Sequence, residues 1–92
     1  MAIASVNPAN GEILKTFEPL ADRELACKLD LAAAAFSTYR KSSFAYRAER
    51  MLKAAEILEA ERECWGRLMS LEMGKPIQAA IDEAVKSAWA CR

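Results

Sequence analysis

The chain has 92 residues, of which 53% are hydrophobic and 28% charged, a size that fits one small domain and excludes two separately cored ones. Thirteen basic and thirteen acidic residues give no net charge, so the chain lacks the overall positive field that attracts nucleic acid or anionic lipid. Histidine is absent, which excludes a Ser–His or Cys–His catalytic pair within these residues.

Targeting and thiol patterns predict a cytoplasmic protein. The longest apolar run, residues 31–36, is far shorter than the ~20 residues of a membrane-spanning helix, and the N-terminus has no signal-peptide pattern. The three cysteines, Cys27, Cys64 and Cys91, are widely separated and form no Cys-x-x-Cys pair. We therefore expect reduced thiols buried as small apolar side chains, rather than disulfides, a zinc site or a nucleophile.

The N-terminal residues predict a β-hairpin over about residues 3–17. Its strands are expected at Ile3–Val6 and Glu12–Phe17, with a turn between them in which Asn10 and Gly11 supply positive φ. Because an isolated hairpin is marginal in water, its apolar side chains need a covering layer.

Two helices are predicted next, at about 22–40 and 43–60. Asp22 is a candidate N-cap for the first, and Ser42 or Ser43 for the second. The first helix has one apolar face, formed by Leu25, Leu29, Ala32, Phe36 and Tyr39. The second has an inward stripe, formed by Ala48, Met51, Leu52, Ala55 and Leu58.

Two more helices are predicted at about 62–73 and 76–92. A break near residues 60–62 is expected, because an unbroken helix would reach about thirty residues against a mean of about eleven. Gly74 stops the third helix and Pro76 occupies N1 of the fourth. Apolar residues surround much of the fourth helix, which is expected to be covered on two sides. Its pattern reaches Arg92 without a stop signal, so we expect a sequence that is cut short.

Two clusters of charged residues could have a functional role, but a structural role is favoured for both. The acidic cluster of Glu56, Glu59, Glu61 and Glu63 could supply a carboxylate pair, but a solvated helix face is the favoured interpretation. The basic residues at the junction of the first two helices are diluted by a glutamate, so nucleic-acid binding is disfavoured; they are Arg40, Lys41, Arg47 and Arg50.

The Gly74-Lys75 pair before a helix suggests a phosphate loop, but the pattern fails. Such a loop needs a second glycine where Met69 stands and Ser or Thr where Pro76 stands. A helix stop and restart is therefore predicted.

Four segments, in order and at matching spacing, resemble the NAD(P)-dependent aldehyde dehydrogenase family: residues 7–12 (Asn-Pro-Ala-Asn-Gly-Glu, with Asn10 for the usual Thr), 43–47, 54–59 and 71–76. The resemblance spans essentially the whole chain. The segments at 1–8 and 83–92 look most like bacterial succinate-semialdehyde dehydrogenases. Glu61 replaces an Asn common in relatives, which weakens the N-cap expected there.

The resemblance implies a fold that is mainly α with an N-terminal β-hairpin, forming the N-terminal fragment of an α/β (Rossmann-like) cofactor-binding domain across residues 1–92. It also implies that the complete enzyme oxidises an aldehyde, here succinate semialdehyde, to a carboxylic acid with NAD or NADP. The family's nucleophilic Cys, Glu base, oxyanion Asn and cofactor cradle do not map onto this sequence, so no catalytic, cofactor-binding or metal residue is assigned. In some relatives, backbone oxygens near the positions of Thr16 and Phe17 bind a monovalent cation.

The leading hypothesis is a scaffold segment that is inactive as a 92-residue chain, binds no NAD or NADP alone, and tends to self-associate. The complete enzyme is expected to act on a small-molecule aldehyde and to form a homo-oligomer, without nucleic-acid or membrane partners. The alternative is a free-standing helical protein-interaction module. The residues leave open NAD versus NADP, the aldehyde and the oligomeric state.

Overall fold

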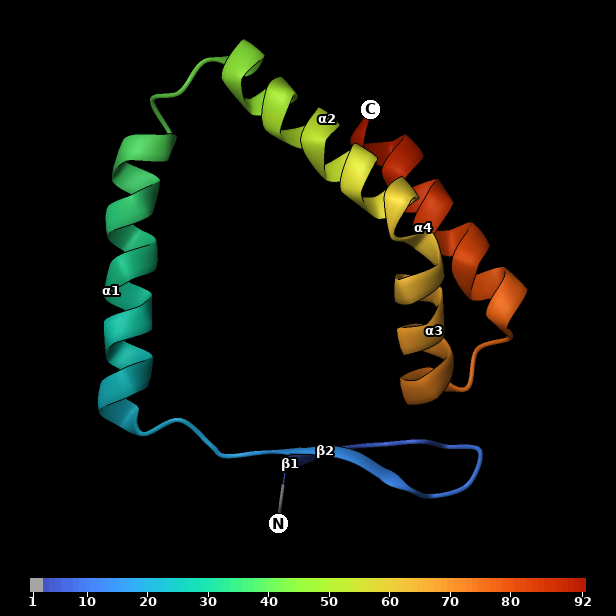
Figure 1. Cartoon of the computed structure of the whole chain (residues 1–92). Coiled ribbons are helices and arrows are strands. Elements are labelled where there is room, and N and C mark those ends of the chain that lie inside the picture. Colours follow the sequence, from blue (N-terminus) through green and yellow to red (C-terminus); the bar gives the residue numbers. More distant parts are fainter. Residues whose placement is uncertain (1–2) are drawn as a thin grey trace.

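The computed structural model describes residues 3–92 and shows a hairpin followed by four helices (Figure 1). The elements are β1 (Ile3–Val6), β2 (Ile13–Phe17), α1 (Asp22–Tyr39), α2 (Phe44–Ala60), α3 (Arg62–Met73) and α4 (Ile77–Cys91). The mainly helical fold with an N-terminal hairpin is therefore confirmed. The family-like opening segment begins at Met1, and its first two residues lie outside the described part.

The hairpin pairs antiparallel from Ile3 opposite Phe17 to Val6 opposite Ile13, and the register shifts by one residue between Ser5 and Val6. The turn differs from the prediction, because Gly11 alone takes positive φ, at 76°. The Asn10 side chain instead accepts a hydrogen bond from the Glu12 N–H at 2.9 Å. Glu12 thus belongs to the turn, and β2 begins one residue later than predicted.

The starts of α1 and α2 depend on different caps. Asp22 is the first helical residue of α1, so its prediction as N-cap is wrong. Ala21 occupies that position, and its N–H donates to the Glu24 carboxylate at 3.1 Å. For α2, the Ser43 hydroxyl accepts from the Tyr46 N–H at 3.1 Å, which makes Ser43 the cap of the two serines considered.

The boundaries around α3 follow local backbone chemistry. Glu61 leaves helical geometry with φ −105° and ψ 18°, which confirms the predicted break between α2 and α3. Gly74 ends α3 in the left-handed conformation with φ 70°, as expected for a C-terminal glycine. The prediction of Pro76 at N1 is wrong by one position: Pro76 is the N-cap with an extended ψ of 134°, and Ile77 is the first residue of α4.

Small residues form the contact between α4 and its neighbours α2 and α3. Among residues 3–92, the buried side chains are all alanines: Ala55, Ala80, Ala84 and Ala88. Gly66 of α3 is buried as well, and a Cβ added there would lie 2.7 Å from Ile81 Cγ1 and 3.0 Å from the Ile81 backbone nitrogen. The α3 and α4 backbones approach this closely because position 66 has no side chain.

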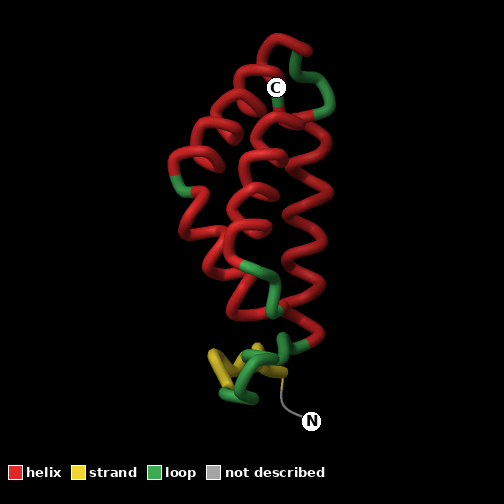
Figure 2. Tube along the Cα trace, turned by 90° about the vertical axis from the view of Figure 1, so that its right-hand side faces the viewer, coloured by secondary structure: helices red, strands yellow, loops and turns green. Residues whose placement is uncertain are grey.

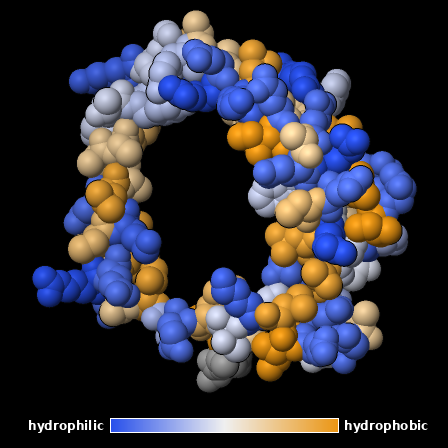
Figure 3. Space-filling view, viewed as in Figure 1, coloured by the Kyte–Doolittle hydropathy of each residue, from blue (hydrophilic) through white to orange (hydrophobic). Residues whose placement is uncertain are grey.

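The elements form a flat, open ring rather than a compact body. Figure 1 shows α1 on one side, α3 and α4 on the other, α2 across the top and the hairpin below, and Figure 3 shows that side chains leave the centre open. The principal extents are 47 × 37 × 14 Å, and Figure 2 shows the flatness edge-on. The radius of gyration of 17.4 Å exceeds the ~12 Å of a compact chain of this length.

The open ring leaves predicted inward faces exposed. In α2, Ala55 is buried and Leu58 is half-buried, whereas Ala48, Met51 and Leu52 are exposed. The apolar face of α1 is exposed along its length, because α1 does not pack along another element of the described chain. Within residues 3–92, the prediction of an inward stripe is thus confirmed at Ala55, whereas it is wrong for Ala48, Met51 and Leu52.

We predict that Gly66→Ala destabilises the α3–α4 contact. Overpacking costs about 1–3 kcal/mol, against about 1 kcal/mol gained from replacing glycine within a helix. Denaturant unfolding followed by helical circular dichroism should therefore show a net loss of up to about 2 kcal/mol. Arg67→Ala is the control, because Arg67 is exposed on the same helix. A stabilised Gly66→Ala chain would contradict the close contact.

Candidate functional site

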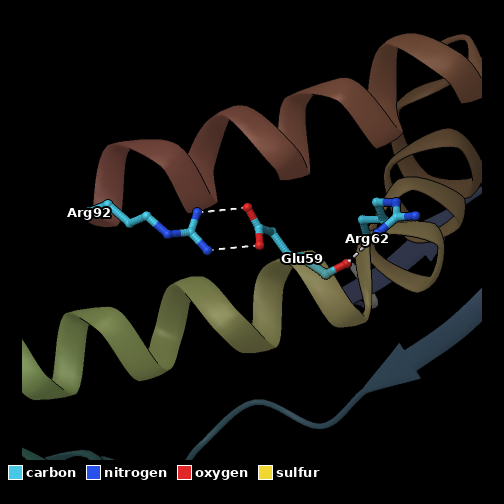
Figure 4. Close-up of polar contacts among 3 residues, drawn as sticks. All are labelled: Glu59, Arg62 and Arg92. Carbon is cyan, nitrogen blue, oxygen red and sulfur yellow. Dashed lines mark hydrogen bonds and ion pairs between the residues drawn. The ribbon is translucent and has the colours of Figure 1, made fainter.

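Glu59, just before the bend between α2 and α3, anchors the end of α4. Glu59 accepts two hydrogen bonds from the guanidinium of Arg92, at 2.7 and 2.8 Å (Figure 4). Arg62 donates to the Glu59 backbone oxygen at 3.1 Å. The hydrogen bonds from Arg92 hold the pKa of the Glu59 carboxyl below its ordinary value of 4.5. This carboxylate therefore serves a structural ion pair, and the pair lies on the surface.

The Gly74-Lys75 turn holds the start of α4 and does not fit a dinucleotide. Lys75 pairs with Glu83, and hydrogen bonding from Lys75 lowers the pKa of that carboxyl. Ser70 donates to the Lys75 backbone oxygen at 2.7 Å. A Cβ at Gly74 would lie 3.1 Å from Pro8 Cγ of the hairpin turn. A phosphate of NAD or NADP would have to displace these contacts.

The cysteines are spread over three helices and form no cluster. Cys27 and Cys64 are exposed and Cys91 is half-buried, so the prediction of buried thiols is wrong for the first two. Cys27 lies on α1, which no other helix or strand covers within residues 3–92, and Cys64 lines a groove together with Ile77 and Ile81. All three are free thiols, as the sequence predicts.

Other predicted sites stay predictions. Thr16 and Phe17 are the last residues of β2 and pair with Ala4 and Ile3. This pairing does not test the cation site that the family resemblance implies near these two residues. Across residues 3–92, no group of three His, Cys, Asp or Glu side chains converges as a metal site. None of the helices in this part of the chain is both long and apolar enough to cross a membrane.

The junction of α1 and α2 carries a cluster that sequence reasoning left unassigned. Three guanidiniums lie over aromatic rings: Arg40 over Phe36 at 5.5 Å, Arg47 over Phe44 at 4.9 Å and Arg50 over Tyr46 at 4.7 Å from the ring centroids. The spacing of three or four residues within each pair is the signal that indicates such helical contacts. The basic residues here thus belong to a combined basic and aromatic surface.

Comparison with known proteins identifies the family. The aldehyde dehydrogenase family model matches residues 1–92, and the chain belongs to this family. It is 48% identical over its whole length to a probable succinate-semialdehyde dehydrogenase [NADP(+)] of Synechocystis, of which it covers 20%. It is 46% identical over 88 residues, 96% of its length, to the succinate-semialdehyde dehydrogenase [NADP(+)] of Mycobacterium leprae, of which it covers 19%. An aldehyde dehydrogenase of Paenarthrobacter nicotinovorans is 44% identical over the whole chain, which covers 20% of it. The chain thus spans about a fifth of the length of the curated relatives it matches, and the predicted resemblance is confirmed.

We predict an acid-sensitive contribution from Glu59. Because its pKa is lowered in the folded chain, its stabilising effect is present above the ordinary value of 4.5 and is lost as pH falls through the lowered value. Glu59→Gln should therefore lower the free energy of unfolding near neutral pH. It should also reduce the amount of stability that the chain loses on acidification to about pH 3. Denaturant unfolding across a pH series measures both effects. Glu18→Gln is the control, and an unchanged pH profile for Glu59→Gln would contradict the prediction.

Proposed function

We propose that this chain is the N-terminal structural part of a cytoplasmic aldehyde dehydrogenase that oxidises succinate semialdehyde to a carboxylic acid with NADP. The match along all 92 residues, at 48% identity to the Synechocystis protein, carries the proposal. The relatives named above with a substrate are succinate-semialdehyde dehydrogenases, and their names specify NADP. In this proposal the residues belong to the cofactor-binding domain, and none of them reacts with the substrate.

The uncovered apolar surface supports a scaffold role. Leu29, Leu31 and Phe36 on α1 are 62–70% exposed, and Trp89 on α4 is 73% exposed. Burying such a side chain stabilises a protein by about 1.5–3 kcal/mol, so a covering layer would gain much from these helices. In the proposed enzyme that layer comes from the rest of the subunit, and the complete enzyme is a homo-oligomer.

The first prediction from this proposal concerns activity. The purified 92-residue chain should not reduce NADP or NAD in the presence of succinate semialdehyde, because the family's nucleophile, base and cofactor cradle do not map onto its residues. Absorbance of the reduced cofactor measures this directly. Cofactor reduction that disappears when Cys27, Cys64 or Cys91 is changed to Ala would overturn the prediction.

The second prediction separates a scaffold from a free-standing interaction module. Changing Leu29 and Phe36 together to Lys should make the isolated chain more soluble and less self-associating, while its helical circular dichroism is retained, because these side chains are exposed. In a full-length chimera, with residues 1–92 replacing the matching part of the Synechocystis protein, the same change should lower soluble yield and thermal stability.

The matched control places both lysines on the polar side of α1, at Asp30 and Ser37, which have the same seven-residue spacing as Leu29 and Phe36. This control should have little effect in either setting. If Leu29→Lys with Phe36→Lys leaves the chimera unchanged, the face is not covered by the rest of the enzyme and the interaction module is favoured.

A further inference from the structure

The junction of α1 and α2 combines four basic and four aromatic side chains, which we call the arginine–aromatic corner. Its members are Phe36, Tyr39, Arg40, Lys41, Phe44, Tyr46, Arg47 and Arg50. The two tyrosines meet edge to face, with ring centroids 6.3 Å apart. This contact joins the end of α1 to the start of α2, so the corner is a surface built by both helices.

Each of the three guanidiniums at the corner has a side that can still bind. A guanidinium that lies over a ring uses its flat face, while its N–H donors point outward in its plane and match a carboxylate. Arg50 also donates to the Tyr46 hydroxyl at 3.0 Å, which fixes its position. The Arg47 Nε atom is buried and has no hydrogen-bond partner within residues 3–92. A buried donor of this kind favours an acceptor supplied from elsewhere.

The corner also has an excess of positive charge. Between residues 40 and 50 there are four basic residues and one acidic residue, Glu49, although the whole chain is neutral. The ion pairs in the described part join Lys53 to Glu56, Lys75 to Glu83 and Arg92 to Glu59, and none includes a cation of the corner. The cations of the corner are therefore available to an outside anion.

We propose that the arginine–aromatic corner is a docking surface for an acidic polypeptide segment. Carboxylates of that segment would accept from Arg40, Arg47 and Arg50, and its apolar side chains would rest in the mainly apolar hollow that Ala35 and Tyr39 help to line. Nucleic acid fits less well, because a guanidinium already covers one face of three of the four rings on which bases would stack.

The two tyrosines make a selective probe, because Tyr39 and Tyr46 are the only tyrosines in the chain. The chain labelled with 3-fluorotyrosine should give two fluorine resonances, both from the corner. We would titrate it with a peptide of alternating Glu and Leu, with the same peptide carrying Gln for Glu, and with a single-stranded oligonucleotide. The glutamate peptide should shift both resonances saturably at low salt, and about 0.5 M salt should weaken the effect through screening.

The double variant Arg40→Gln, Arg47→Gln should bind the glutamate peptide roughly threefold more weakly, or weaker still, because each exposed ion pair contributes only a small binding free energy. This variant keeps the contact between Arg50 and Tyr46 that positions the probe. Lys28→Gln with Arg67→Gln removes the same charge away from the corner and should bind like the unmodified chain. Helical circular dichroism checks the fold of both variants.

Three results would overturn the proposal: no saturable shift with the glutamate peptide, an equal response to the glutamine peptide, or tighter binding of the oligonucleotide. The first two need only the unmodified chain, so a misfolded variant does not affect them. The inference is tested separately from the enzyme proposed above, since soluble yield and thermal stability of the full-length chimera test that proposal.

Discussion

The close approach of α4 to α2 and α3 is the contact on which this structure depends. It is made by alanines at four-residue spacing, Ala80, Ala84 and Ala88, and by Gly66, where Ile81 of α4 fills the space that a side chain would need. Small residues allow helix backbones to come near one another, but they remove little apolar area from water. The contact therefore fixes geometry more than it supplies stability.

Polar contacts at both ends of α4 complete this arrangement. Lys75 and Glu83 pair near its start, and Arg92 reaches back from its end to Glu59 of α2. Exposed ion pairs of this kind contribute little stability each, but they set the helix in one register against its neighbours. The hairpin joins the same unit by a hydrogen bond of 2.5 Å from Ser5 to Glu72. By contrast, α1 lies on the opposite side of the ring from α3 and α4, and packs against no other helix or strand within residues 3–92.

Local signals in the sequence predicted the fold well, whereas burial could not be predicted. Gly74 is a local stop signal, and the break near Glu61 followed from the improbable length of an unbroken helix, so the sequence alone located both. The apolar face of α1 predicted that this side of the helix is buried. Apolar periodicity shows which side of a helix favours burial, but it does not show whether another element packs on that side. The Glu59–Arg92 pair could not be predicted, because it joins residues far apart in the chain. The ring contacts of the arginines, at three- and four-residue spacing, were within reach of sequence reasoning.

Amide hydrogen exchange on the intact 92-residue chain tests the central claim most directly, namely that packing around α4 sustains itself while α1 and the hairpin need cover. Exchange should be slowest in α4 around Ala84 and in α2 around Ala55, and markedly faster at Leu29 of α1 and at Ile13 of β2. Equal protection of Leu29 and Ala84 would mean that α1 is already packed in this chain, which would contradict the account.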